Sequence, residues 1–145
     1  MKTKILNEEP ARTIAIVFEP GDNVMVGLSK LVKELGISAG QISGLGAFKS
    51  AVVGFFDREQ HDYQRIIVNE QVEVLAFAGV IALAGEEPKP HIHVVLGKSD
   101  GTAHGGHLLE AEVWPTLELI LEELPGYLRR KFDAETNIPL IDLNA

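Results

Sequence analysis

The chain has 145 residues, no cysteine, and 13 Lys+Arg against 21 Asp+Glu, which gives a formal net charge of −8. Its length fits one domain over residues 1–145, its 46% hydrophobic residues can build a core, and the lack of cysteine fits a cytoplasmic protein without disulfides. No apolar run reaches the roughly 18 residues of a membrane span, and the acidity disfavours nucleic-acid binding, which depends on a basic face.

The first part of the chain predicts a strand followed by a helix. Residues 13–22, TIAIVFEPGD, are β-branched and apolar, and they stop at a Pro-Gly turn signal. Apolar residues then recur at helical spacing over residues 24–35, and Asp22 or Asn23 can cap the start of this helix. Gly36 stands where a left-handed C-terminal cap belongs.

The middle of the chain predicts β-structure. Residues 37–57 contain four glycines, a density that suits two strands or one long bent strand better than a helix. Residues 61–71 alternate between polar and apolar positions and predict a hairpin. Residues 72–85 predict a buried strand with an interruption at Gly79, and residues 85–90, GEEPKP, predict a loop.

The last part of the chain gives a less definite prediction of secondary structure. Residues 116–124, TLELILEEL, are ambiguous because their apolar positions satisfy the spacing of a helix and of a strand, and residue propensity favours the helix. The tail, residues 137–145, predicts an edge strand or a segment packed against a neighbouring molecule. Residues 127–131, YLRRK, are the densest basic run, and we interpret them as a solvated patch.

Four of the five histidines lie in residues 91–107, HIHVVLGKSDGTAHGGH. Ser99–Gly101 has the chemistry of a three-residue hairpin loop, a type I turn followed by a glycine in the left-handed conformation. Counting back along both strands from this loop places His93 opposite His107, with His91 two residues further along. Side chains alternate across a strand and opposed residues share a face. The three imidazoles are therefore predicted to emerge on one side.

Three imidazoles on one face indicate a metal site. Opposed Cβ atoms lie about 4.5–5.5 Å apart, and zinc–nitrogen bonds of about 2.0–2.1 Å then need only modest rotamer changes. We predict zinc, or another divalent metal, bound by His91, His93 and His107 with a fourth position open. The alternatives are a water-filled histidine patch and rings locked by hydrogen bonds. His104 is expected on the other face, and its role is left open.

Glu73 is a second candidate, because it is a carboxylate inside the apolar run VEVLAF. A buried carboxylate needs a partner, so Glu73 would orient a histidine or transfer a proton. The alternative is an edge position that is open to solvent. Glu110 and Glu112 are expected on the face opposite the three histidines, as surface charges.

Three segments carry a family resemblance: GISAGQISGLGAFKSAVVGFFD, VEVLAFAG and KPHIHVVLGKSDGTAHGGHLLEAEVWPTLELIL. Over roughly residues 11–143 the chain resembles the PPC family, also called DUF296 or PD1-like DNA-binding proteins. The resemblance implies an α+β fold, in which a single mixed, largely antiparallel sheet wraps around a helix, and a homotrimer. It makes residues 115–124 a strand. It also implies that His91, His93 and His107 are zinc ligands, on a fold similar to that of acetolactate decarboxylase.

Two functions remain open at this level. The first is a metal-dependent lyase or hydrolase that acts on a small anionic substrate, with Glu73 assisting. The second is a DNA-binding or regulatory protein without enzymatic activity, which requires Lys49 and residues 129–131 to cluster on one face. The chain has no R-G-R-P AT-hook, and its acidity disfavours DNA. A structural trimer that retains an unused histidine site is a third possibility.

Overall fold

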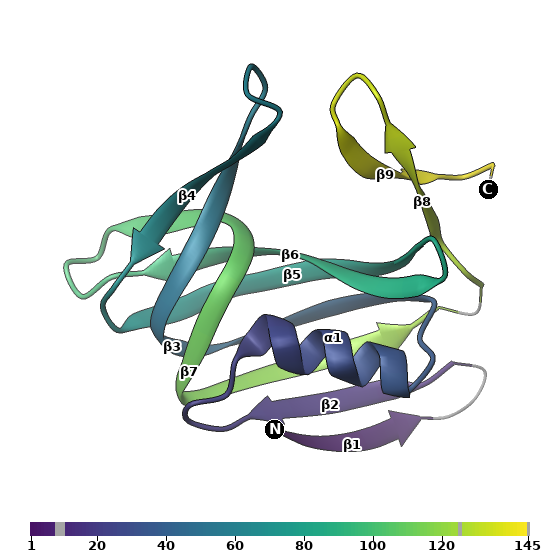
Figure 1. Cartoon of the computed structure of the whole chain (residues 1–145). Coiled ribbons are helices and arrows are strands. Elements are labelled where there is room, and N and C mark those ends of the chain that lie inside the picture. Colours follow the sequence, from purple (N-terminus) through teal and green to yellow (C-terminus); the bar gives the residue numbers. More distant parts are fainter. Residues whose placement is uncertain (8–10, 125, 145) are drawn as a thin grey trace.

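The computed structural model describes residues 1–7, 11–124 and 126–144. Within these ranges the chain forms one helix and nine strands (Figure 1). In chain order they are β1 (Lys2–Asn7), β2 (Thr13–Phe18), α1 (Val24–Glu34), β3 (Ala39–Asp57), β4 (Asp62–Val68), β5 (Val72–Ala84), β6 (Glu87–Gly97), β7 (Ala103–Glu123), β8 (Arg129–Asp133) and β9 (Ile138–Asp142). No helix of this part of the chain is long and apolar enough to span a bilayer.

All nine strands belong to one sheet, in the order β1-β2-β7-β3-β5-β8-β9, with β4 paired to β3. The strand β6 pairs with β5 on one edge and with the start of β7 on the other. Because β3 pairs with both halves of β7 and also with β5, the strands β3, β5, β6 and β7 close around an interior. Every pairing is antiparallel except that of β5 with β8. The predicted α+β class, with a mixed and largely antiparallel sheet, is confirmed.

The helix α1 covers the inner face of this sheet, where it packs on β6 and β7 (Figure 1). Its start is capped by Asn23, whose Oδ1 accepts a hydrogen bond from the Val26 amide at 3.1 Å. Its end is the predicted glycine cap: Gly36 has a φ of +67°, and the Ile37 amide donates to the Val32 carbonyl at 3.0 Å.

The core lies between the helix and the inner face of the sheet. Its members are apolar side chains that recur at helical spacing on α1 and at alternate positions on the strands. They include Val24, Leu28, Leu31 and Val32 of α1, Ile14, Ile16 and Phe18 of β2, and Leu117, Leu119 and Leu121 of β7. No described polar side chain is fully buried, so chemistry is confined to the outer face and the edges.

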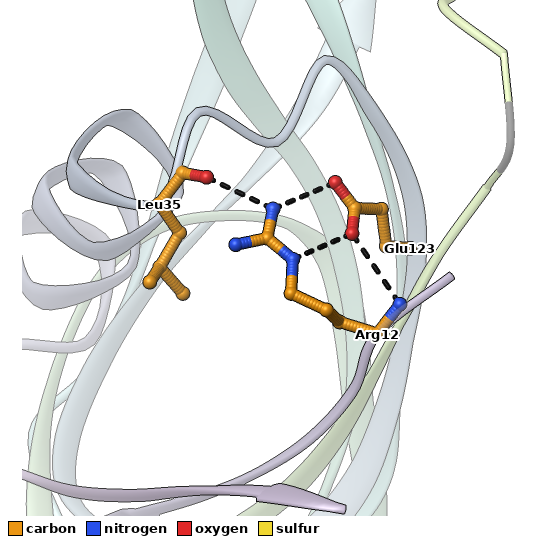
Figure 2. A network of polar contacts seen from close by, with 3 residues as sticks. All are labelled: Arg12, Leu35 and Glu123. Carbon is orange, nitrogen blue, oxygen red and sulfur yellow. Dashed lines mark hydrogen bonds and ion pairs between the residues drawn. The ribbon is translucent and has the colours of Figure 1, made fainter. Parts of the chain in front are cut away.

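An arginine ties the start of β2 to the end of β7 and to the end of the helix (Figure 2). The Nε and Nη2 atoms of Arg12 donate to the two carboxylate oxygens of Glu123 at 2.6 and 2.7 Å, and Nη2 also donates to the Leu35 carbonyl at 2.9 Å. This bidentate arrangement is the strong form of an ion pair. It joins three segments that are distant in sequence.

The region predicted as two strands or one bent strand is the single 19-residue strand β3. Its register against β7 shifts at three places, as a bent strand requires. Gly44 is needed there, because a side chain at this position would overlap the carbonyl oxygen of Glu118 on β7. The glycines of this region therefore allow two long strands to cross at close range.

Three local predictions from the sequence differ from the structure. Residues 61–71 form not a hairpin but one strand, β4, paired with the end of β3. The loop predicted for residues 85–90 is only a turn at Gly85 and Glu86, since β6 begins at Glu87. Its prolines are tolerated because β6 pairs with β7 only from His93 onward, which leaves one edge open. The irregularity of β5 lies between Val74 and Ala76 rather than at Gly79.

The segment 116–124 is the end of the long strand β7, as the family resemblance implied. The final strand β9 is an edge strand, as predicted for the tail, and it forms a hairpin with β8. In Figure 1 this hairpin stands beyond the body of the sheet, on the same side as the β3–β4 hairpin. Only Leu83 and Ala84 of β5 pair with it.

Candidate metal centre

The β6–β7 hairpin has the predicted turn. The Lys98 amide donates to the Thr102 carbonyl at 2.9 Å, the Gly101 amide donates to the Lys98 carbonyl at 3.0 Å, and Gly101 has a φ of +82°. The Asp100 carboxylate accepts from the Thr102 amide at 2.9 Å, which stiffens the reversal. This turn fixes the register, and His93 pairs with His107 as counted from the sequence.

The three histidines converge on one side of the hairpin. Each offers a ring nitrogen, and these three atoms lie within 4.8 Å of one another. The Nε2 atoms of His91 and His93 are 3.1 Å apart. The His107 ring stands at a steep angle to both, with centroid distances of 4.7 Å to His91 and 5.5 Å to His93. The pairing of β6 with β7 ends at His93, yet His91 keeps the same face because it lies two residues away on β6.

His107 is held by close backbone packing and by an aromatic ring. A side chain at Gly106 would place its Cβ 2.7 Å from the Gly54 carbonyl oxygen, so the glycine lets β7 lie against β3. The Tyr63 ring covers Gly54 and stacks on the His107 imidazole, with a centroid distance of 4.7 Å and an interplanar angle of 22°. Tyr63 reaches the site from β4, and no spacing in the sequence pointed to it.

The surroundings favour the neutral form of two of the three histidines. Burial, reinforced by electrostatic repulsion from His91, His93 and Arg130, lowers the pKa of His107 to about 4. Burial is also the main cause that lowers the pKa of His91, with Arg130 and His93 adding to it. Neutral imidazoles are the form that binds metal ions. His91 and His107 are therefore ready to act as ligands without first losing a proton at neutral pH.

The donor set fits a zinc ion. Tetrahedral zinc with bonds of about 2.0–2.1 Å holds its nitrogens about 3.3 Å apart, so the observed separations need only small side-chain movements. The Nδ1 atom of His107 is buried and has no hydrogen-bond partner in the described part of the chain, which leaves a ring nitrogen available to an ion. Three histidine ligands would leave a fourth position for a small molecule.

A cavity of about 700 Å³ lies beside His91 and His93 on the outer face of the sheet. Its lining comes from six strands of the described chain: Gln41, Ile42 and Ser43 of β3, Ala78, Gly79 and Val80 of β5, His91 and His93 of β6, Ile120 and Glu122 of β7, Arg130 of β8, and Pro139, Leu140 and Ile141 of β9. The β8–β9 hairpin thus forms one wall of the cavity, and the two β6 histidines lie in another.

Arg130 is a site residue that the sequence did not identify. Its Nη1 donates to the Lys89 carbonyl at 3.0 Å, and its Nη2 donates to the Val80 carbonyl at 3.2 Å. Val80 is the β5 residue paired with His91, so the guanidinium lies beside the histidines. Arg130 is half-buried, and burial lowers its pKa. Its interpretation as part of a solvated patch is therefore wrong.

Glu73 does not take the place expected of a site residue. It is exposed on β5, five residues from Ala78, the partner of His93. At about 3.3 Å per residue this is roughly 16 Å along the strand. The premise of a buried carboxylate is wrong, and the alternative of a solvent-exposed position holds. His104 pairs with Leu96 and is exposed, outside the three-histidine group, as expected.

The chain matches the Plants and Prokaryotes Conserved (PCC) domain over residues 6–125. It belongs to this family. A solved metal-containing protein from Archaeoglobus fulgidus is 32% identical, with a TM-score of 0.83, over 97% of this chain and 96% of that one. A plant- and prokaryote-conserved (PPC) protein from Pyrococcus horikoshii is 28% identical, with a TM-score of 0.85, over 98% and 96%.

A protein from Ralstonia eutropha JMP134 described as a "putative DNA-binding protein" is 27% identical, with a TM-score of 0.83, over 90% of each chain. The expected fold similarity to acetolactate decarboxylase is also found. A Staphylococcus aureus protein described as similar to that enzyme has a TM-score of 0.55 over 79% of this chain and 53% of its own, but at 13% identity it shares the fold alone. No curated protein matches the chain. The family identified from the histidine segment is confirmed.

Proposed function

We propose that this PCC-domain protein binds a divalent metal ion, zinc before others, through His91, His93 and His107. The observation that supports it best is the convergence of three histidine ring nitrogens within 4.8 Å of one another on the outer face of one hairpin. A relative with 32% identity is described as metal-containing, which agrees with the proposal.

The proposed activity is that of a metal-dependent lyase or hydrolase acting on a small anionic substrate. A zinc ion with three imidazole ligands supplies a Lewis acid with one open position. The chain's own residues do the rest: the β6–β7 hairpin fixes the ligand geometry, Tyr63 orients the His107 ring, and the wall formed by β9 shields one side of the cavity from water. Glu73 has no part in this proposal, because it lies far along β5.

Metal analysis of untagged protein tests this function. We expect about one zinc ion per chain in the wild type and loss of that ion in His93→Ala. The matched control is His104→Ala, which removes an exposed histidine of the same hairpin and should leave the zinc content unchanged. Zinc well below one ion per chain, with the same content in His93→Ala as in the wild type, would refute the proposal.

The proposed assembly is a homotrimer in the cytoplasm. In support of assembly, large apolar side chains outside the cavity lining are exposed on the sheet and on the β8–β9 hairpin, among them Leu45 at 63%, Leu75 at 61% and Phe132 at 61%. Such groups usually mark contact surfaces. Sedimentation analysis should give a mass three times the chain mass of 15.8 kDa, whereas a monomer mass would contradict the trimer.

DNA binding is the second candidate, because the Ralstonia relative is described in those terms. This chain offers it less support. Lys49 pairs with Glu112 at 2.8 Å and Arg129 pairs with Glu86 at 3.0 Å, so the basic residues considered for a DNA-binding face are partly neutralised. A filter-binding titration decides: retention of duplex with an affinity that falls steeply with salt favours DNA, and no retention at low salt excludes it.

A further inference from the structure

Arg130 differs from the other partly buried arginines. Arg12 pairs with Glu123 at 2.6 Å, and Arg129, its neighbour in sequence, pairs with Glu86 at 3.0 Å. Among the described residues, no carboxylate forms an ion pair with Arg130, which bonds instead to two backbone carbonyls. A half-buried cation without a counter-charge is costly. Its position therefore indicates that the anion comes from outside the chain.

Two hydrogen bonds hold the Arg130 guanidinium in place and leave its other N–H donors available. Arginine has five N–H donors in a planar fork, and the carbonyls of Val80 and Lys89 take two of them. Those two bonds fix the plane of the group beside His91, because Val80 pairs with His91 across the β5–β6 ladder. The remaining donors suit a planar carboxylate, which matches a guanidinium edge.

The neighbouring walls are mainly apolar, with Gln41, Ser43 and Glu122 as their uncharged and acidic polar members. Ala78 and Val80 of β5, Ile120 of β7, and Leu140 and Ile141 of β9 line the same cavity. Its lining carboxylate, Glu122, already accepts a hydrogen bond from the side-chain amide of Gln41. A single available arginine among apolar side chains suits a singly charged ligand with a hydrocarbon part better than a phosphate dianion.

We propose that Arg130 and this apolar wall form a subsite for a small carboxylate with a hydrocarbon part, bound beside the three histidines. The subsite deepens the proposed function by naming a substrate class, and it rests on that function only for the role of the metal. Arg130 binds the carboxylate, and the hydrocarbon part lies against Val80 and Leu140.

Isothermal titration with 2-methylpropanoate tests the subsite, and 2-methylpropanamide serves as the uncharged ligand of the same shape. We expect the wild type to bind the acid, and the amide to bind at least about tenfold more weakly, because hydrogen bonds to a charged partner are the stronger ones. Arg130→Gln should weaken binding of the acid by a similar factor.

Arg129→Gln is the matched control variant. It removes the neighbouring bonds from β8 to Gly85 and Glu86, so it loosens the same hairpin without touching the cavity lining. We expect binding of the acid to stay within about twofold of the wild type. A loss in Arg129→Gln as large as in Arg130→Gln would overturn the subsite, because attachment of the hairpin would then explain both results.

Zinc content, measured on the same samples and on chelator-treated protein, separates the two proposals. If the protein binds no zinc but still binds the acid through Arg130, the subsite proposal stands and the metal-binding proposal is refuted. If the protein binds zinc, but the wild type and Arg130→Gln bind the acid equally well, the metal-binding proposal stands and the subsite is refuted. Failure of the wild type to bind the acid would also overturn it.

Discussion

Two partly buried polar clusters of this molecule differ in how their charges are matched. In the Arg12–Glu123 cluster the guanidinium meets both oxygens of a carboxylate and a helix-end carbonyl, so charge is matched within the chain (Figure 2). In the cluster of His91, His93, His107 and Arg130, no carboxylate of the described chain forms an ion pair with the cation, although Glu122 lines the cavity beside it. The first cluster holds segments together, and the second is the one we propose to bind ligands.

The comparison predicts that an added metal ion stabilises the second cluster. Zinc at a hundred times its dissociation constant should raise the free energy of unfolding of metal-free wild type by about 2.7 kcal/mol, because it binds the folded state. Thermal unfolding with and without zinc measures this effect. His93→Ala should show no such increase, and an equal increase in that variant would place the ion elsewhere.

A substitution in the Arg12–Glu123 cluster should lower the free energy of unfolding even when no zinc is added. Glu123→Gln removes the charge that the Arg12 guanidinium faces, and we expect the free energy of unfolding to fall by about 2 kcal/mol in urea titrations. Glu34→Gln is the control, because Glu34 forms an exposed pair with Lys30 at 3.8 Å, and it should change stability by less than about 0.5 kcal/mol. Equal effects of the two substitutions would show that burial of the Arg12 pair contributes nothing.

The same cluster should respond to pH. Hydrogen bonds from the Arg12 side chain hold the pKa of Glu123 below its ordinary value of 4.5. A lowered carboxyl pKa contributes stability above the ordinary value, and this contribution is lost as pH falls through the folded-state pKa. The difference in unfolding free energy between wild type and Glu123→Gln should therefore be constant from pH 7 to 5 and shrink at lower pH. A difference that grows on acidification would contradict the assignment.

The smallest predicted effect concerns the ring that orients His107. Tyr63→Leu removes the stacked aromatic face and should weaken zinc binding by about threefold to tenfold, since stacked pairs contribute about 0.5–1.5 kcal/mol. Tyr63→Phe keeps the ring and should retain wild-type affinity in a competition titration with a zinc chelator. Equal weakening by both substitutions would assign the effect to the hydroxyl group instead of the stacked ring.

The sequence predicted what local chemistry determines. The turn at Ser99–Gly101 sets the pairing of β6 with β7, and from it the common face of the three histidines followed by counting. Arg130 and Tyr63 could not be found in this way, because β8 meets β5, and the β3–β4 hairpin meets β7, through long-range pairing. Glu73 was misjudged because an apolar neighbourhood in sequence was taken for burial, although alternate residues of a strand face opposite sides.

The β8–β9 hairpin places part of the cavity lining in a different stretch of the chain from the three histidines. The stretch that matches the PCC family ends at residue 125 and carries all three histidines, whereas Arg130 and the β9 wall come after it. Two ladder pairs with β5 and the side-chain bonds of Arg129 and Arg130 join this hairpin to the sheet. Substitutions in the last twenty residues can therefore reshape the cavity wall, while the hairpin that carries the three histidines stays as it is.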